Sequence, residues 1–483
     1  MANGTEHLYF GHPAALKDPH LKDYFVFTDP IRAISDFADP RCIIVGKKGS
    51  GKTAVFLRLA ESNGVGTLVT VAINQYSHEL AAFQRAAPYS RFTNMFAFEI
   101  LLEMLRGFLA NPTARRPFAR TFIAAVGVAA SEYLQRFAGI ANLAEMSIDT
   151  PIFGIGLARG ANADEAIRLS GVKSLKKLCA KVGEITAKGV KFRVLIDDPD
   201  LLVGDVSQFL PTVGGLLTAA VDLPVLVPTP DVKVCVFVKQ HKYDALSRTF
   251  EDFDHIRENA MSLTWSRAEL IQMVAARVRY QEKLPAGAND LSCWSAAFAV
   301  SSEGELTKFA DYLLPLLTNG PRDLITFCNL ARRVAAQAQH AKITIEDFRA
   351  AEAEYSVDCL KEVEREYTDT YPAISVIVQK LFEHKDLRAR ATISRGVLEA
   401  ALSERYRSPD IQELKRDVKW LASETGRGLV DVLFTVGVIG FLSKRSERLM
   451  SYSSRAAGDS VASARTFFVH PAYGRALGLL GES

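Results

Sequence analysis

The sequence is poor in cysteine, and its few cysteines form none of the patterns that cross-link small domains or bind zinc. The six cysteines stand at positions 42, 179, 235, 293, 328 and 359, and no two of them make a Cys-x-x-Cys pair. Most have apolar neighbours in the sequence. We therefore expect reduced thiols within a core, and neither a disulfide framework nor a zinc site.

The chain also lacks a hydrophobic run long enough to cross a membrane. Its most apolar stretch, Thr121 to Ala130, is far shorter than the roughly 20 residues that a membrane-spanning helix requires. Residues 1–7 show no basic segment followed by an apolar one, so we expect no export signal. No internal repeat and no low-complexity run is visible. These absences favour a cytoplasmic protein that makes no contact with membranes.

Charge of neither sign is in large excess. The 483 residues are 48% hydrophobic and 23% charged, with a net charge of +3, which is ordinary usage for a globular protein. So small a net charge does not by itself imply a nucleic-acid partner. The length predicts two to four domains.

The most informative feature that is present is a glycine-rich loop between an apolar run and a helical pattern. Cys42 to Val45 is typical of a buried strand and residues 54–60 of a helix. Between them, Gly46-x-x-x-x-Gly51-Lys52-Thr53 matches the phosphate-binding loop pattern. Glycines let successive backbone N–H groups point at phosphate oxygens, and the helix N-terminus adds positive potential. The alternative is a glycine-rich turn that matches by chance, but strand, helix and Lys-Thr together favour phosphate binding.

This loop predicts a site for ATP and Mg²⁺. We expect Lys52 to reach the β- and γ-phosphates and the Thr53 hydroxyl to hold Mg²⁺. The residues predicted to cradle the nucleotide are Gly46, Lys47, Lys48, Gly49, Ser50, Gly51, Lys52 and Thr53.

A second buried-strand pattern, Val194 to Ile196, ends in acidic residues. An Asp at the carboxyl end of such a strand lies beside the phosphate loop of a parallel sheet. We predict that Asp197 belongs to the Mg²⁺ shell and that Asp198 positions or activates the attacking water. An acidic turn after a strand would be the simpler interpretation if this motif stood alone. Many ATPases have Glu where Asp198 stands, and the shorter side chain argues against fast hydrolysis.

Two further basic residues are candidates for sensing the γ-phosphate. Lys239, or its neighbour Gln240, ends the next buried strand, where a cation would stabilise developing charge. The alternative is a solvated strand end. Arg322 projects from the first turn of a predicted helix that Pro321 opens. The alternative is that Arg322, like most arginines in the first turn of a helix, is simply exposed to solvent.

These pieces together resemble the STAND-like branch of P-loop ATPases, related to AAA+ proteins and including bacterial families found beside defence genes. They are also similar in order to the origin-recognition ATPases. The matching segments are Val45 to Thr53, Ile196 to Asp200, the strand of Lys239, Leu263 to Ser266, and Gly320 to Asp323. The resemblance implies a lid whose Arg322 contacts the γ-phosphate, and a nucleotide-controlled switch that oligomerises. Two departures stand out, because no catalytic Glu follows Asp197 and Lys239 stands where relatives often have Arg.

The last hundred residues resemble a winged helix. Helices are predicted at 374–382, 393–406 and 411–422, followed by a helix, a glycine stop and a strand within 431–442 and a return strand at 467–470. A basic wing, roughly 443–465, would suit DNA phosphates. Winged helices also serve as protein contacts, so DNA and protein both stay open as partners of this part.

The predicted fold class is α/β: a P-loop parallel sheet with flanking helices, then a helical lid and a winged-helix-like domain. The predicted divisions are an N-terminal docking segment (1–40), an ATPase core (41–265, with a helical insertion around 91–165), a lid (266–370) and the C-terminal domain (371–483). The function favoured is an ATP-dependent switch, a homo-oligomer that controls an effector encoded nearby, in bacterial antiphage defence. A DNA-associated ATPase and a nucleotide-binding scaffold with little turnover are the alternatives. No second catalytic constellation is apparent.

Overall fold

The computed structural model describes residues 5–62, 66–73, 89–140, 171–199, 206–227, 229–250, 253–318, 320–388, 392–442, 449–450 and 461–479. The chain forms two compact units. One, which we call the sheet unit, is Phe27–Thr264; the other, the helical unit, consists of Met1–Val26 and Trp265–Ser483. None of the described helices is long and apolar enough to span a membrane.

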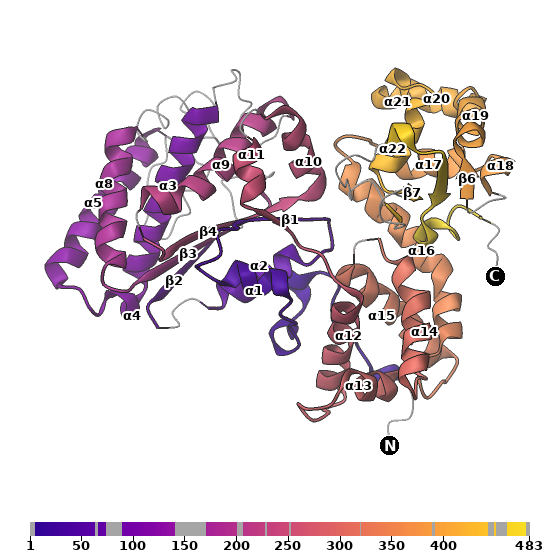
Figure 1. Ribbon diagram of the computed structural model, residues 1–483, viewed down its shortest axis with the longest axis horizontal. Helices are drawn as coiled ribbons and strands as arrows, with labels where there is room; N and C mark the ends of the chain where they lie inside the picture. Colours follow the sequence, from indigo (N-terminus) through magenta and orange to yellow (C-terminus); the bar gives the residue numbers. More distant parts are fainter. Residues whose placement is uncertain are drawn as a thin grey trace. The chain divides into compact units, whose positions relative to one another are not determined.

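The sheet unit is built on five parallel strands (Figure 1). They are β1 (Ile43–Gly46), β2 (Leu68–Ile73), β3 (Lys191–Asp197), β4 (Val232–Lys239) and β5 (Ala260–Ser262), in the spatial order β2-β3-β4-β1-β5. All four neighbouring pairs are parallel. The central strands are buried along nearly their whole length, as expected where helices cover both faces. The predicted α/β class is therefore confirmed.

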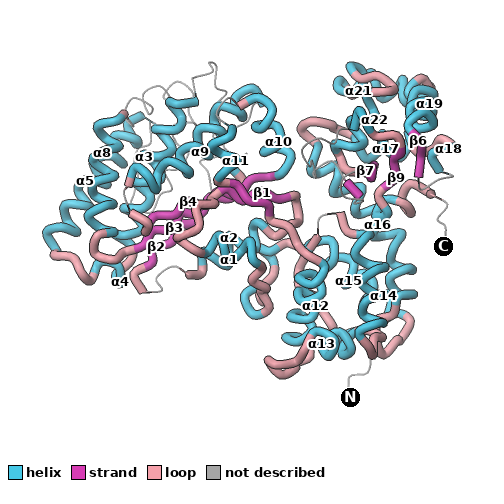
Figure 2. The backbone as a smooth tube through the Cα atoms, viewed as in Figure 1, coloured by secondary structure: helices cyan, strands magenta, loops and turns pink. Residues whose placement is uncertain are grey.

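Helices cover the two faces of this sheet unequally (Figure 2). On one side lie α1 (Asp29–Ser35) and α2 (Lys52–Ala60). The other side carries α3 (Tyr89–Ala110), α4 (Pro112–Arg115), α5 (Arg120–Ile140), α8 (Val172–Thr186), α9 (Val206–Leu226), α10 (Gln240–Thr249) and α11 (Phe253–Glu258).

The long helix α3 is the centre of the thicker layer. It packs against α5, α8, α9 and strand β2. Gly107 lets α3 approach β2 closely, because a Cβ there would lie 2.9 Å from a Val69 methyl and 2.8 Å from a Val71 methyl. The predicted helical content of 91–140 is confirmed as α3, α4 and α5. The loop predicted at 141–165 lies outside the described residues.

Two buried cations fasten the chain before β1 to the sheet. The Lys233 ammonium donates to the carbonyl oxygens of Ala33 at 3.1 Å, Asp39 at 2.9 Å and Asp36. On the neighbouring strand, Arg193 donates to the carbonyl of Ser35 at 2.7 Å. Burial lowers the pKa of both cations.

The helical unit begins with α12 (Arg267–Gln281), α13 (Asp290–Ala297), α14 (Glu303–Leu313), α15 (Pro321–Gln337) and α16 (Ile345–Tyr367). Two of these helices start with reciprocal capping bonds between side chain and backbone. Ser266 and Glu269 form a capping box on α12, and Thr344 and Asp347 form one on α16.

Residues 5–26 pack within the helical unit, whereas 27–40 pack within the sheet unit, so the segment predicted as one docking piece is divided between them. The Arg277 guanidinium of α12 donates to the Phe10 carbonyl at 2.8 Å and lies 4.5 Å from the centre of the Tyr24 ring. Asn329 of α15 accepts from the Phe10 N–H at 3.2 Å and donates to the Gly11 carbonyl at 3.0 Å.

The C-terminal part contains the helices α17 (Ile374–Leu381), α18 (Lys385–Arg388), α19 (Arg395–Tyr406), α20 (Pro409–Asp417), α21 (Lys419–Ser423) and α22 (Gly428–Thr435). Its antiparallel sheet has the order β6-β9-β7-β8, from β6 (Thr392–Ser394), β7 (Ile439–Leu442), β8 (Leu449–Met450) and β9 (Thr466–Val469). Gly437, at φ 79°, makes the predicted glycine stop between α22 and β7. Most of the predicted wing, including Lys444, Arg445 and Arg448, lies outside the described residues.

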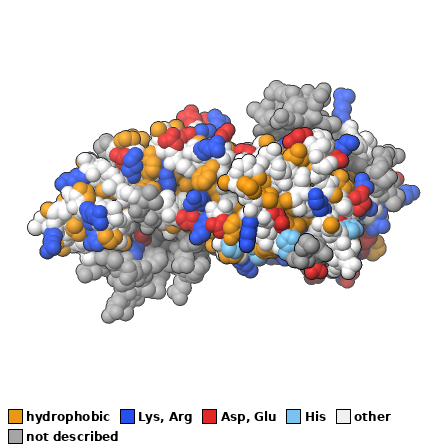
Figure 3. Space-filling view, turned by 90° about the horizontal axis from the view of Figure 1, so that it is seen from below, with side chains coloured by type: hydrophobic (Ala, Val, Ile, Leu, Met, Phe, Trp, Pro, Cys, Tyr) orange, Lys and Arg blue, Asp and Glu red, His pale blue; other side chains and the backbone are white. Residues whose placement is uncertain are grey.

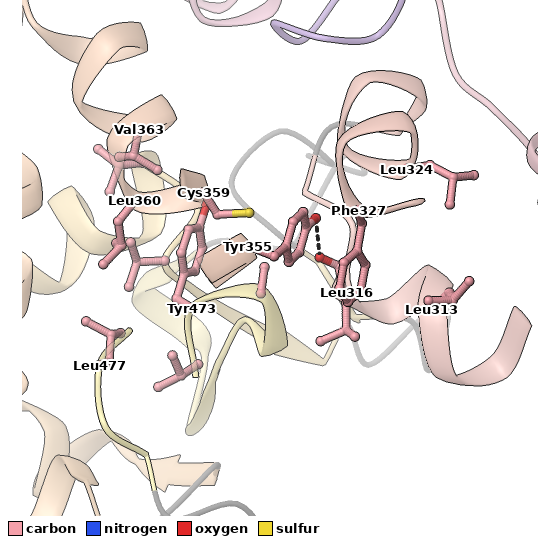
Figure 4. Close-up of a cluster of buried hydrophobic side chains, with 14 of the residues drawn as sticks. Leu313, Leu316, Leu324, Phe327, Tyr355, Cys359, Leu360, Val363, Tyr473 and Leu477 are labelled. Carbon is pink, nitrogen blue, oxygen red and sulfur yellow. Dashed lines mark hydrogen bonds between the residues drawn. The ribbon is translucent and has the colours of Figure 1, made fainter. Parts of the chain in front are cut away.

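The C-terminal segment returns to helix α16. Tyr473 and Leu477 are buried beside Cys359 and Leu360 of that helix (Figure 4). The Ala476 N–H donates to the Ser356 hydroxyl at 2.9 Å. The helices α12–α16 and the C-terminal part therefore share one hydrophobic core. All six cysteines are free thiols, as predicted.

Candidate functional site

The loop between β1 and α2 is tightly curled. Gly49 and Gly51 have φ angles of 88° and 99°, in the left-handed region that favours glycine. A side chain at Gly46 would collide with the Ser50 hydroxyl. The Ser50 N–H donates back to the Lys47 carbonyl at 3.2 Å. The glycines of the motif are thus required by the shape of the loop.

The Lys52 side chain folds back across the loop that it follows. Lys52 is the first residue of α2 and is only 7% exposed. Its ammonium donates to the carbonyl oxygens of Gly46 at 2.7 Å and Lys47 at 3.0 Å. A positive charge is therefore fixed beside the backbone of the loop, where an anion held by that backbone would meet it.

The structure joins Thr53 and Asp197, which are 144 residues apart in sequence. The Thr53 hydroxyl donates to the Asp197 carboxylate at 3.0 Å. Thr53 lies in the first turn of α2, and Asp197 is the last residue of β3, at the carboxyl edge of the sheet. The two residues predicted to hold a metal are therefore in direct contact.

The environment of Asp197 is unfavourable to its charge. Burial raises the pKa of Asp197 to about 6, and the nearby charge of Asp198 acts in the same direction. The Thr53 hydroxyl, Lys52 and the Asp198 N–H partly offset this rise.

Asp198 and Lys239 were each predicted as separate site residues, and the structure brings them together. The Lys239 ammonium lies 3.7 Å from the Asp198 carboxylate. Lys239 ends β4, the strand beside β3, so both residues stand at the same edge of the sheet. The ion pair between Asp198 and Lys239 was not predicted. The sequence did hold a signal for it, because residues of opposite charge stand at the carboxyl ends of two predicted strands. Gln240, the alternative to Lys239, is the first residue of α10 and donates to Asp244 at 3.0 Å.

Asp198 has an unusual backbone conformation, with a φ of 47°. Among residues other than glycine, Asp and Asn enter this left-handed region most readily. This backbone conformation therefore suits an Asp at position 198.

The residues present fit an Mg²⁺–phosphate group by the chemistry of their donors. Thr53 supplies a hydroxyl oxygen and Asp197 a carboxylate, and Mg²⁺ in proteins is commonly held by one or two such oxygens together with substrate phosphates. Within the described ranges, no three His, Cys, Asp or Glu side chains gather into a metal site made by protein alone.

Arg322 belongs to the helical unit, whereas the residues above belong to the sheet unit. It stands in the first turn of α15, and its guanidinium lies 3.9 Å from Glu362 of α16. The adjacent Asp323 is buried and accepts from the Thr318 N–H at 2.9 Å, which fixes the start of α15.

The C-terminal part carries no Lys or Arg on α22, the helix that precedes β7. In α22, Leu429, Val430, Val432, Leu433 and Phe434 are buried. The exposed charged residue of this helix is Asp431.

Comparisons with known proteins give two resemblances. Residues 268–364 match a family described as the FunZ-associated C-terminal helical domain. This match covers nearly all of helices α12–α16 and does not include the glycine-rich loop. The chain is also similar to a protein of Escherichia coli (strain K12) described as "Putative transposon gamma-delta 80.3 kDa protein". That alignment has 21% identity over 500 residues and covers 97% of this chain and 67% of the other protein.

Proposed function

We propose that the protein binds ATP with Mg²⁺ at the carboxyl edge of its parallel sheet and acts as a nucleotide-controlled switch. The observation that carries this proposal is the contact between Thr53 and Asp197, made beside a curled loop that Lys52 crosses. If the glycine-rich turn matched the motif only by chance, no contact between its Thr53 and Asp197 at the end of β3 would be expected.

The strand order supports a ligand site at this edge. From β1 the chain passes to β2 at the far side of the sheet, returns through β3 and β4, and then places β5 on the other side of β1. The order therefore reverses at β1. Ligands of open α/β sheets bind outside the carboxyl ends of the strands at such a point.

The residues have distinct roles in this proposal. Backbone N–H groups of 46–53 hold phosphate oxygens, and Lys52 moves its ammonium from the loop carbonyls to the β- and γ-phosphates. Thr53 and Asp197 hold Mg²⁺, which when bound neutralises phosphate charge. Asp198 orients the attacking water, and Lys239 stabilises negative charge that develops on the γ-phosphate.

Hydrolysis is expected to be slow. The Asp198 carboxylate is short and already faces Lys239 at 3.7 Å, so this ion pair competes with the water that Asp198 would orient. Slow turnover suits a switch, because the ATP-bound state then persists long enough to act on a partner.

The proposed assembly is a cytoplasmic homo-oligomer that controls an effector protein, with α12–α16 as the lid. The C-terminal part would be a winged-helix-like domain, and its acidic, mostly buried α22 favours a protein contact there over DNA. The family resemblance supports a role in antiphage defence. The similar protein described as a transposon protein supports the alternative, an ATPase associated with DNA of mobile elements.

The proposal is tested by calorimetry with ATP and Mg²⁺. Lys52→Ala should weaken ATP binding at least tenfold, since a charge-assisted bond contributes about 1.5–3 kcal/mol and 1.4 kcal/mol is tenfold. Lys308→Ala, an exposed lysine of α14, is the control and should bind as the unmodified protein does. Equal affinity in Lys52→Ala would refute the assignment of the loop.

A second variant separates the metal from the nucleotide. Asp197→Ala should keep part of the ATP affinity and lose Mg²⁺-dependent phosphate release, because the phosphates would still contact the loop. If phosphate release continues at the normal rate, the metal acid lies elsewhere in the chain.

A further inference from the structure

The outer helices of the sheet unit carry a concentrated positive charge that the whole-chain value conceals. Segments 112–133 and 171–190, which contain α4, most of α5 and all of α8, hold eight Lys and Arg residues and two Glu, a net charge of +6. The whole chain has a net charge of only +3, so the remainder sums to −3. The eight cations are Arg115, Arg116, Arg120, Lys173, Lys176, Lys177, Lys181 and Lys188. We call their surface the basic face.

The fold explains why these cations share one surface. On α8, Leu175, Leu178, Val182 and Ile185 are buried, and the helix packs against α3. The lysines of α8 occupy the positions between these residues and are turned outward. Figure 3 shows several Lys and Arg side chains and few acidic ones at its left-hand end, the end at which Figure 1 places α4, α5 and α8.

Two contacts join the end of α8 to the start of α5. The Lys181 ammonium lies 5.3 Å from the centre of the Phe122 ring, and the Lys188 ammonium lies 5.2 Å from that of Phe118. Lys188 also donates to the Pro117 carbonyl at 3.4 Å. These contacts place the arginines of α4 and α5 and the lysines of α8 on one continuous surface.

Most of these charges are not neutralised within the described part of the chain. Lys181 pairs with Glu184 at 3.0 Å. By contrast, no described carboxylate pairs with Arg116, Arg120, Lys173, Lys176 or Lys177, and all five are exposed. Five cations on a surface with so few acids repel one another. Such a surface attracts an anionic partner by its summed charge.

We propose that the basic face binds the phosphate backbone of nucleic acid. α8 has 15 residues and is about 22 Å long at 1.5 Å per residue. Duplex DNA carries about one charge per 1.7 Å, so a charged surface of this length matches several successive phosphates. A membrane is the less suitable partner, because α8 uses its apolar side to pack on α3 and cannot also bury that side in lipid. This site is separate from the proposed ATP site and from the C-terminal part.

The experiment measures fluorescence anisotropy of a labelled 20-base-pair duplex of mixed sequence with the full-length protein. Binding is expected in the micromolar range at about 0.1 M salt, as for other sequence-independent contacts. Lys173→Gln/Lys176→Gln/Lys177→Gln should weaken it at least tenfold. The slope of log K against log salt should fall by about 2–3, since each phosphate contact contributes about 0.9. Gln keeps helix propensity, so the melting temperature should not change.

Lys308→Gln/Lys342→Gln/Lys385→Gln is the matched control. It removes the same charge from exposed sites of the helical unit and should bind within twofold of the unmodified protein. Three results would overturn the proposal: no binding to duplex or single strand at 50 mM salt, an unchanged salt slope in the α8 variant, or loss of binding only in Lys444→Ala/Arg445→Ala/Arg448→Ala. Binding to phosphatidylserine vesicles without binding to DNA would also overturn it.

Discussion

The ion pair between Asp198 and Lys239 sets the chemistry of the candidate site at the scale of single residues. In the structure, the Lys239 ammonium neutralises the Asp198 carboxylate. In the proposed ATP complex it would move from that carboxylate to the γ-phosphate. The left-handed backbone conformation of Asp198 sets the direction in which its side chain leaves the backbone. The pair is partly exposed, so its own contribution to folding is about 0–1 kcal/mol, and its replacement should not unfold the protein.

We expect Lys239→Met to lower the ATP turnover number about 10²–10³-fold, the usual effect of removing one group that stabilises developing charge. Asp198→Asn and the double variant complete a double-mutant cycle, measured by phosphate release at saturating ATP. If Lys239 serves only to neutralise Asp198, the double variant will be no slower than Asp198→Asn alone. That result would remove Lys239 from the catalytic residues.

Among the elements, the sheet unit depends on buried cations as well as on its apolar strands. Lys233 lies within β4 and is only 3% exposed, yet its ammonium donates to three backbone carbonyls, one in the last turn of α1 and two in the chain that follows it. The Ala33 carbonyl, in the last turn of α1, also accepts from the Asp36 N–H at 3.2 Å, whereas the Asp36 and Asp39 carbonyls lie beyond the end of the helix. Lys233 therefore connects the segment before β1 to the strand beside it.

Replacing Lys233 with Met should destabilise the sheet unit by about 1–3 kcal/mol, the cost of leaving buried polar groups without a donor. Hydrogen exchange at residues 33–39 should accelerate before exchange in β4. Lys176→Met is the control, because Lys176 is an exposed residue of α8 in the same unit. Equal protection of residues 33–39 in both variants would show that apolar contacts hold this segment.

The elements also show what the sequence could and could not predict. The strands β1, β3 and β4 were predicted because each is a short apolar run. The anchoring by Lys233 and Arg193 could not be predicted, since their partners are backbone carbonyls, which every sequence provides. The ion pair of Asp198 and Lys239 required the strand order, which depends on packing between segments far apart in the chain.

At the scale of the whole molecule, the helices α12–α16 and the C-terminal part behave as one body. Helix α16 contributes to both, since Tyr367 at its end donates to the Thr435 carbonyl at 3.1 Å and Ser356 in its middle holds Ala476. Arg475 adds an ion pair to Glu352 at 3.5 Å. If the proposed ATP site moves these helices, the C-terminal part is expected to move with them.

The last prediction is that nucleotide sets the state of assembly through Arg322. ATP can shift an equilibrium between two lid positions only if it contacts them differently, and Arg322 is the residue that the family resemblance assigns to that contact. Its present partner is Glu362, at 3.9 Å and partly exposed, so the arginine can leave it at a cost of no more than about 1 kcal/mol. We expect a homo-oligomer whose population differs between ATP and ADP.

Arg322→Ala should make the mass of the assembly independent of nucleotide while ATP binding is largely kept. Arg333→Ala is the matched control, because Arg333 also lies on α15 and also pairs with a glutamate of α16, Glu354. Light scattering of both variants and of the unmodified protein, at several concentrations and with the partner present, measures the effect. An identical mass for the unmodified protein without nucleotide, with ADP and with an ATP analogue would exclude the switch and leave a nucleotide-binding scaffold. If Arg333→Ala uncouples assembly as fully as Arg322→Ala does, the coupling depends on the packing of α15 against α16 and not on a contact between Arg322 and the γ-phosphate.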